Sequence, residues 1–200
     1  MGFYQPPAMD AGALDGLYSL LAAGNSFVAF DFETTGLSPA VDRIVEIGAI
    51  RFGLRETADG WSYDQLASFH SLVNPRRPIP ATVSSIHGIY DLDVASAPTF
   101  AEIGAAFLDF LGKSVLVAHN ASFDCGFLQA EATRNRLSIP ANPVYDTIIL
   151  AKTARPRLES YALGKLAKVF GIAQQAAHRG DDDARVCMEI FYRSIRLLYS

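Results

Sequence analysis

Apolar and polar positions alternate most clearly in the first third of the chain, where they predict three strands. Residues 26–33, 43–54 and 66–73 are each rich in apolar, β-branched or aromatic side chains, as the strands of a sheet are. We expect residues 55–65 to connect the second and third strands as a hairpin. Residues 74–80 contain three prolines and should be irregular. The three strands therefore predict a meander.

Elsewhere the apolar positions recur with the period of a helix. Residues 10–23 predict a short amphipathic helix before Gly24, preceded by a loose tail over 1–9. Further helices are expected over 99–111, 121–137, 147–154, 160–170 and 181–199, with short strands over 114–118 and 144–146. A meander followed by alternating strands and helices predicts an α/β or α+β fold with a mixed sheet.

Composition and charge narrow the class of protein. Half of the 200 residues are hydrophobic and 19% are charged, which fits one folded domain and excludes a disordered chain. A formal net charge of −4 disfavours tight, nonspecific duplex binding. It does not exclude nucleic acid, because acidic metal ligands lower the total charge.

The cysteines and the N-terminus bear on the compartment. Cys125 and Cys187 both lie in apolar helical patterns, which favours buried free thiols and a reducing cytoplasm. The N-terminus has no signal-peptide pattern. No apolar run approaches the ~20 residues of a membrane span, so no membrane partner is expected.

A pair of carboxylates ends the first predicted strand. Asp31 follows an apolar run, and Glu33 comes one position after Phe32. Because side chains in a strand alternate between faces, Asp31 and Glu33 point to one face and Phe32 to the other. Two like charges side by side repel each other. The pair therefore predicts a cation between them, most simply a divalent metal ion.

Two further acidic segments each lie at the start of a predicted helix. Asp124 falls in the first turn of the helix over 121–137, where the helix dipole favours an acid even without a function. Residues 178–185 read HRGDDDAR, with His178 before a helix start and three acids in its first turn. Together these acids would supply the oxygen ligands that Mg²⁺ or Mn²⁺ prefer, and the absence of cysteine ligands disfavours a structural zinc site.

Three segments carry a family resemblance. DFETTG (31–36), HNASFD (119–124) and HRGDDDAR (178–185) resemble, in this order and at these intervals, the three motifs of the DEDDh (DnaQ-like) 3′–5′ exonuclease family. Weaker matches are IHGI at 86–89, YDT at 145–147 and SYALGKLAKVFGI at 160–172. The chain most resembles the proofreading (epsilon) subunit or domain of bacterial replicative DNA polymerase III.

The resemblance implies a fold and a domain organisation. The family fold is ribonuclease H-like, a five-stranded mixed β-sheet flanked by α-helices. It agrees with the element order predicted from the pattern. We therefore expect residues 1–25 to form a tail and a short helix, and residues 26–200 to form the exonuclease domain.

The resemblance also implies the catalytic residues. Asp31, Glu33, Asp124 and Asp183 match the four acids that hold two Mg²⁺ (or Mn²⁺) ions, and His178 matches the general base. Asp183 is preferred over its two acidic neighbours because the family acid stands five residues after the histidine. Histidine has an unperturbed pKa of about 6.5, so a residue of this type can accept a proton from the attacking water near neutral pH.

Residues on the substrate side follow from the same resemblance. It places the backbone of Thr34 and Thr35 at the terminal nucleotide, Leu37 against the terminal base and His87 near the substrate. Asn120 and Phe123 would line the terminal-nucleotide pocket.

Each of these residues also has a structural interpretation. Thr34 and Thr35 suit a turn after a strand, and His87 suits a hydrogen-bonded position in a loop. Asn120, or else Ser122, could cap the following helix, and Phe123 could be a core aromatic residue.

The implied function is metal-dependent hydrolysis of DNA from its 3′ end, at single-stranded or frayed ends, with release of nucleoside monophosphates in proofreading or repair. Expected partners are DNA 3′ ends and a DNA polymerase subunit. One alternative is an RNase T-like or oligoribonuclease-like enzyme that acts on RNA 3′ ends. Another is a noncatalytic nucleic-acid-binding module, which the presence of all four acids and the histidine disfavours.

Overall fold

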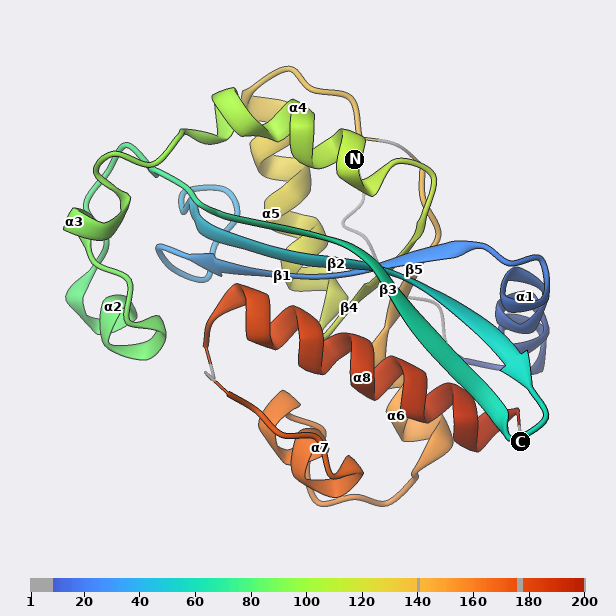
Figure 1. The fold of residues 1–200 in the computed structure, drawn as a ribbon. Coiled ribbons are helices and arrows are strands. Elements are labelled where there is room, and N and C mark those ends of the chain that lie inside the picture. The colour runs from blue at the N-terminus through green and yellow to red at the C-terminus, as the bar shows by residue number, and fades with distance from the viewer. Residues whose placement is uncertain (1–8, 140, 176–177, 200) are drawn as a thin grey trace.

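In a computed structural model that describes residues 9–139, 141–175 and 178–199, a five-stranded sheet lies between two layers of helices (Figure 1). The strands are β1 (Ser26–Thr34), β2 (Ile44–Thr57), β3 (Gly60–Leu72), β4 (Val115–Ala118) and β5 (Val144–Asp146). They lie in the order β3-β2-β1-β4-β5. The first three strands pair antiparallel, whereas β4 is parallel to β1 and to β5. The predicted mixed sheet is confirmed.

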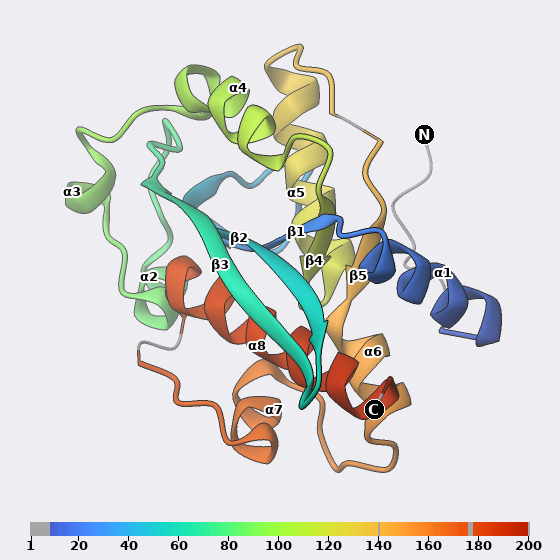
Figure 2. The same cartoon turned by 45° about the vertical axis from the view of Figure 1, so that its right-hand side comes forward.

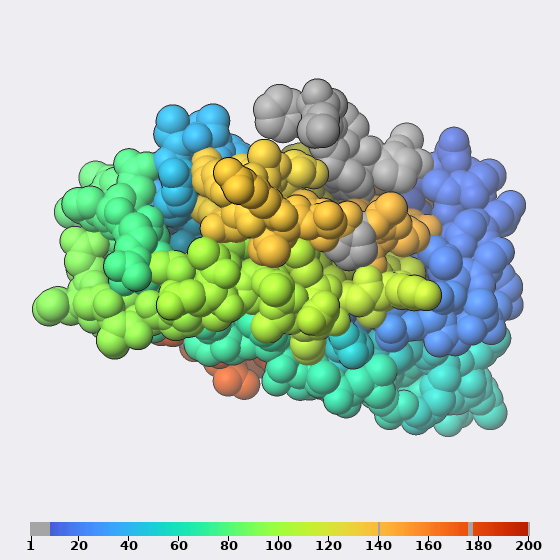
Figure 3. Space-filling model, turned by 90° about the horizontal axis from the view of Figure 1, so that it is seen from above, coloured from blue at the N-terminus to red at the C-terminus, as the bar shows by residue number. Residues whose placement is uncertain are grey.

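Helices cover both faces of this sheet (Figures 1 and 2). One face carries α4 (Phe100–Leu111) and α5 (Ala121–Arg134), and the other carries α6 (Thr147–Ala154), α7 (Leu163–Phe170) and α8 (Gly180–Leu198). The helix α1 (Ala11–Ala22) lies at the opposite end from α2 (Ala81–His87) and α3 (Asp91–Val94). Figure 3 looks down on the α4 face and shows the outer part of the β2–β3 hairpin extending past α4.

The strand β1 contributes to the core on both faces because its side chains alternate. Phe27 is fully buried against α8, and Phe32 packs edge-on against Phe107 of α4 with ring centroids 5.7 Å apart. Fully burying such a side chain contributes roughly 1.5–3 kcal/mol. Asp31 and Glu33 have the same parity as Phe27, so the strand directs both to one face, as predicted, and this is the face covered by α8.

The β2–β3 hairpin is longer than the sequence predicts. Residues 55–65 were expected to form the connection, but strand pairing continues until Thr57 lies opposite Gly60. Most side chains here are exposed, so burial gives no alternation to detect. Trp61 is the exception: it is buried, and its ring lies edge-on to Tyr18 of α1 with centroids 6.4 Å apart.

The predicted helices lie within one residue of their observed bounds, except at the start of α7 and the end of α5. The predicted capping box of α4 is present, with Glu102 accepting a hydrogen bond from Thr99 N at 2.7 Å. The predicted helix over 121–137 ends earlier, at Arg134. No helix was predicted between residues 81 and 98, because α2 and α3 are too short to show a period.

Several smaller predictions concern the termini and cysteines. The predicted tail lies almost wholly outside the described residues, and α1 packs on the sheet through Leu17 and Leu21. Cys187 is buried and Cys125 half-buried, and both are free thiols. Within the described ranges, no helix combines the length and apolar character needed to cross a membrane.

Candidate active site

A cavity of about 640 Å³ opens beside the end of β1, next to α5, α7 and the start of α8. It brings together all five predicted catalytic residues, together with two of the predicted substrate-binding residues. Its lining consists of Asp31, Phe32, Glu33, His119, Asn120, Phe123, Asp124, Ala162, Leu163, Gly164, Lys165, Lys168, Gln174, His178 and Asp183.

Asp124 is tied directly to the strand that carries the first two acids. Its side chain is 2% exposed, and its Oδ1 accepts a hydrogen bond from Phe32 N at 3.0 Å. Phe32 stands between Asp31 and Glu33, so this bond fixes the third carboxylate beside the first two. It forms because the turn after β4, which is parallel to β1, brings the start of α5 to this end of the sheet.

Asp183 and His178 approach the same acids from the start of α8. Asp183 accepts hydrogen bonds from His178 N at 3.0 Å and from Gln174 Nε2 at 2.9 Å. Carboxylate oxygens of Glu33 and Asp183 and a ring nitrogen of His178 all lie within 4.8 Å of one another. The preference for Asp183 agrees with this geometry, because Asp182 instead pairs with Arg185 at 2.7 Å.

The four carboxylates lie in an environment that opposes their charge. Burial, followed by repulsion from neighbouring acids, raises the pKa of Asp31 well above its ordinary range. The same two effects raise the pKa of Glu33 to about 8. Burial also raises the pKa of Asp124 and of Asp183. A cluster with these properties is unfavourable when fully ionised, unless a cation offsets the negative charge.

The carboxylate oxygens of this cluster suit a hard divalent cation. The ligand atoms of the four acids are oxygens, which Mg²⁺ and Mn²⁺ prefer. The cluster lies at a cavity, so water and a phosphate can reach it. The family resemblance implies that these residues bind metal, and the chemistry of their side chains fits that role.

The substrate-side residues divide into two groups. Asn120 and Phe123 line the cavity, whereas Thr34, Thr35, Leu37 and His87 do not. Thr34 Oγ1 donates to Gly36 O at 2.6 Å, and Thr35 Oγ1 accepts from Arg43 N at 3.1 Å, so both side chains shape the turn after β1. Their backbone contacts with a nucleotide stay a prediction.

Leu37 and His87 differ strongly in exposure. Leu37 is 85% exposed, which leaves it free to contact a base. His87 is 4% exposed, and its Nδ1 accepts from Ile89 N at 3.0 Å. Burial lowers the pKa of His87, and its Nε2 has no hydrogen-bond partner in the described parts of the chain. The substrate roles of both residues stay predictions.

The N-cap position of α5 was predicted correctly, but the side chain that supplies the capping hydrogen bond was not. Asn120 occupies the N-cap position with φ 62°, but its side chain makes no capping hydrogen bond, nor is Ser122 the cap. Asp146 accepts from Ala121 N at 2.9 Å and from Ile148 N at 2.8 Å, so one carboxylate caps both α5 and α6. The available signal was the YDT segment, in which an acid directly precedes a helix.

The sequence interpretation missed four polar residues of the cavity wall. Lys165 and Lys168 lie on α7, whose apolar side packs against α8. Gln174 is the donor to Asp183 described above. His119 forms a hydrogen bond with Thr147 Oγ1 through Nδ1 at 2.8 Å, and burial lowers its pKa to about 4. The two lysines place positive charge where an anionic substrate would enter.

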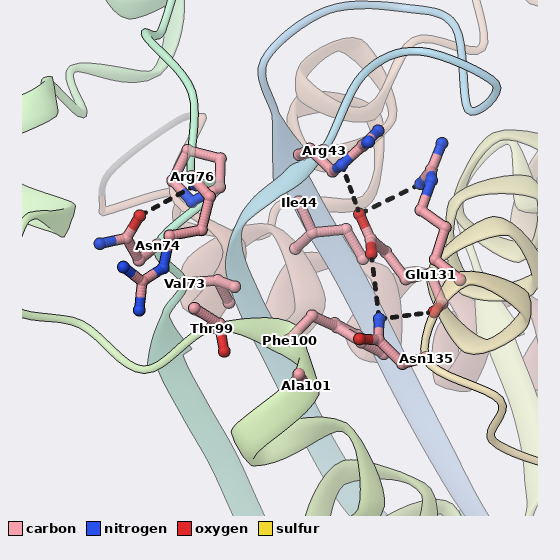
Figure 4. Close-up of a pocket in the computed structure, with 12 residues that line it drawn as sticks. Arg43, Ile44, Val73, Asn74, Arg76, Thr99, Phe100, Ala101, Glu131 and Asn135 are labelled. Atoms are coloured by element: carbon pink, nitrogen blue, oxygen red, sulfur yellow. Dashed lines mark hydrogen bonds and ion pairs between the residues drawn. The ribbon is translucent and has the colours of Figure 1, made fainter.

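A second hollow, of about 400 Å³, lies beside the start of β2 (Figure 4). Its buried Glu131 pairs with Arg134 at 3.2 Å and lies 3.9 Å from Arg43. Arg43 also donates to the Val41 carbonyl at 2.9 Å, and Arg134 to the Ala40 carbonyl at 2.9 Å. These guanidinium groups therefore hold the β1–β2 loop in place.

Comparison with known sequences gives a consistent result. The sequence pattern of the exonuclease family matches residues 28–191. The DNA polymerase III subunit epsilon of Treponema pallidum is 44% identical over 168 residues, covering 83% of this chain and 74% of that protein. The DNA polymerase III PolC-type of Caldanaerobacter subterraneus subsp. tengcongensis is 37% identical over 172 residues, but this chain spans only 12% of its length.

Comparison with solved structures supports the same fold. Exonuclease X, solved in complex with 5′ overhanging duplex DNA, matches with a TM-score of 0.62 and 25% identity, over 84% of this chain and 90% of that one. E. coli exonuclease I, solved with a dT13 oligonucleotide, matches with a TM-score of 0.69 and 21% identity, over 86% of this chain and 40% of that one. The expected ribonuclease H-like fold is confirmed.

Proposed function

This chain belongs to the exonuclease family, and we propose that it hydrolyses DNA from the 3′ end, at single-stranded or frayed ends, in proofreading or repair. The 44% identity to a DNA polymerase III epsilon subunit supports DNA as the substrate. The match to exonuclease X in complex with DNA supports it independently.

One observation carries this proposal. Asp31, Glu33, Asp124 and Asp183 come from three separate parts of the chain and meet with His178 in one cavity. Burial and mutual repulsion raise the pKa values of the acids, as is typical of functional sites. A purely structural role would not require four carboxylates at the wall of a cavity.

The four acids would hold two Mg²⁺ or Mn²⁺ ions. When bound, such ions activate a water molecule and stabilise the charge that develops on a phosphodiester during its hydrolysis. The roles of the individual acids follow the family assignment. Without a cation, the like charges of the cluster would repel a phosphate.

The other residues of the cavity have distinct roles in the proposal. His178, which is exposed at the cavity wall, accepts the proton of the attacking water. Lys165 and Lys168 attract the backbone phosphates of the strand. Phe123 presents an aromatic surface on which the terminal base can stack, and Asn120 offers hydrogen-bonding groups beside it.

A single assay tests this function. With Mg²⁺, a 5′-labelled DNA strand should shorten progressively, whereas a 3′-labelled strand should release labelled mononucleotide at once. Chelation should stop both signals. A parallel RNA strand distinguishes the RNA-trimming alternative, because faster hydrolysis of RNA than of DNA would contradict the assignment of DNA as the substrate.

Two substitutions test the residue roles. Asp31→Ala should abolish hydrolysis in a chain that still folds, and His178→Ala should lower kcat by about 10²–10⁴-fold, the usual range for a general base. Asp181→Ala is a matched control, because Asp181 lies in the same turn of α8 as Asp183 but does not line the cavity. Near wild-type rates for Asp31→Ala would refute the assignment.

We also propose a DNA polymerase as partner, because the relatives include an epsilon subunit and PolC-type polymerases. Co-purification with a replicative polymerase from the source cells, absent for an unrelated exonuclease of similar size, would test it.

A further inference from the structure

A buried glutamate outside the four predicted metal ligands holds the segment that carries His178. Glu46 lies in β2 directly opposite Glu33 of β1, and it is 0% exposed. Its carboxylate accepts hydrogen bonds from Gly180 N at 2.9 Å, Arg179 Nη2 at 3.0 Å and His70 Nε2 at 2.8 Å. A buried carboxylate costs several kcal/mol unless it is paired, and Glu46 is fully paired.

These bonds seat the first residues of α8 on the sheet. Arg179 follows His178 in the chain, and Gly180 is the first residue of α8. Gly48, two positions after Glu46, has no side chain, and a Cβ there would overlap the Gly180 carbonyl. The start of α8 therefore rests directly on the β2 backbone, with Glu46 bonded to its first amide.

The conformation of His178 depends on this contact between α8 and β2, because the His178 backbone is strained. Its φ is 61°, a left-handed conformation that residues other than glycine adopt only when their surroundings hold them. On one side, the His178 amide donates to Asp183 at 3.0 Å. On the other side, the next two residues, Arg179 and Gly180, are bonded to Glu46.

A competing interpretation is that Glu46 is a ligand of an additional metal ion. Ligand atoms of Glu46, His70 and Asp181 lie within 4.8 Å of one another. However, the guanidinium of Arg179 already lies against Glu46, and a positive group at that distance repels a metal ion. The contacts favour a role through Arg179 and Gly180.

We propose that Glu46 is a positioning residue for hydrolysis: it acts through Arg179 and Gly180 to hold the His178 imidazole beside Glu33 and Asp183. The inference rests on the proposed function, because it assigns Glu46 a role in that same reaction. It predicts that the effect of Glu46 on turnover requires His178.

A double-mutant cycle tests this dependence. Glu46→Gln keeps the size of the side chain and an acceptor for Gly180 N but removes the charge that holds Arg179. It should lower kcat by about 10–100-fold, the range typical of residues that orient catalytic groups, with KM nearly unchanged. In a His178→Ala background the same substitution should lower kcat by less than about 3-fold, because the group it positions is absent.

Two further variants complete the design. Arg179→Gln should reproduce the loss, and Arg179→Lys, which keeps the charge but not the planar fork, should recover part of it. The Arg179 side chain is 41% exposed, and Arg179→Lys keeps a positive charge beside Glu46, so this variant should fold even if Glu46→Gln does not. Glu189→Gln is the matched control. Glu189 lies farther along α8, accepts a hydrogen bond from Tyr63 and does not line the cavity.

The possible outcomes distinguish failure of this inference from failure of the proposed function. If the wild-type chain does not hydrolyse 3′ ends with Mg²⁺, the proposed function fails and the inference fails with it. If the wild type is active and both Glu46→Gln and Arg179→Gln keep its kcat, only the inference fails. An equally large loss in the His178→Ala background also overturns it, since Glu46 would then act without His178.

Discussion

Asp31, which we propose as a metal ligand, shows how such a residue can oppose the stability of its own fold. Its carboxylate is partly buried and lies near Asp124, Glu33 and Asp183, and the burial and these neighbours all raise its pKa. At a pH above this raised pKa, Asp31→Asn removes one charge while keeping the size of the side chain. In the presence of a chelator it should therefore raise Tm, by about 2–4 °C for each kcal/mol of repulsion relieved, while hydrolysis is lost.

The control for this prediction is another acid outside the cluster. Asp181→Asn should give no such gain, because Asp181 lies in the first turn of α8, where the helix dipole favours a negative charge. Thermal unfolding of the three proteins in chelator measures the effect. A lower Tm for Asp31→Asn than for the wild type would show that repulsion at Asp31 is already relieved.

At the scale of elements, the approach of α8 to the sheet depends on a glycine in β2. Gly48→Ala would place a methyl group in the Gly180 carbonyl, so α8 must shift. Overpacking of this kind costs about 1–3 kcal/mol. Because α8 carries Asp183 and follows His178, we expect a fall in kcat of at least about 10-fold as well, since small misplacements of catalytic groups are costly.

The same strand offers a matched control for Gly48→Ala. At Gly53, also in β2, the nearest atom to an added Cβ is Leu66 Cδ1 at 3.8 Å, an ordinary contact. Gly53→Ala should leave kcat unchanged, with stability equal or slightly higher. Urea unfolding and the 3′-hydrolysis assay are run on both variants. Equal effects of the two substitutions would mean that α8 does not need this close approach.

The elements also show what the sequence could and could not predict. The apolar run before Asp31 predicts β1 and the direction of its two acids, because alternation along a strand is a local property. The role of Glu46 could not be predicted, because its partners Arg179 and Gly180 lie 133 and 134 residues away. The sequence showed Glu46 only as a lone acid within the apolar run of β2, and the periodicity of that run does not explain why an acid stands there.

At the scale of the whole molecule, the topology assembles the cluster. The parallel pairing of β1 with β4 brings Asp124, at the start of α5, to Asp31. The helix α8 packs on the face of the sheet opposite to α5, and its start brings Asp183 and His178 to the same acids. The family resemblance named these residues, and the structure brings them together in one cavity. It gave no information on their burial or their hydrogen bonds, which depend on the packed fold.

Packing of these like charges makes the stability of the molecule depend on both pH and cations. The pKa of Glu33 is raised from 4.5 to about 8, so between these pH values the folded chain holds more protons than the unfolded chain. Without metal, this contribution to stability is present below about pH 4.5 and is lost as pH rises toward 8. A divalent cation replaces the protons, so it should stabilise the fold more at pH 8 than at pH 5.5.

The expected size follows from mass action. At a hundredfold excess of Mn²⁺ over its Kd, binding stabilises the folded state by about 2.7 kcal/mol, or roughly 5–10 °C in Tm for a chain of this length. Thermal unfolding with and without Mn²⁺ at pH 5.5 and 8 measures the difference. Glu33→Gln, with one acid fewer, should show a smaller shift at pH 8. A Mn²⁺ shift as large at pH 5.5 as at pH 8 would mean that cations and protons do not compete for these carboxylates.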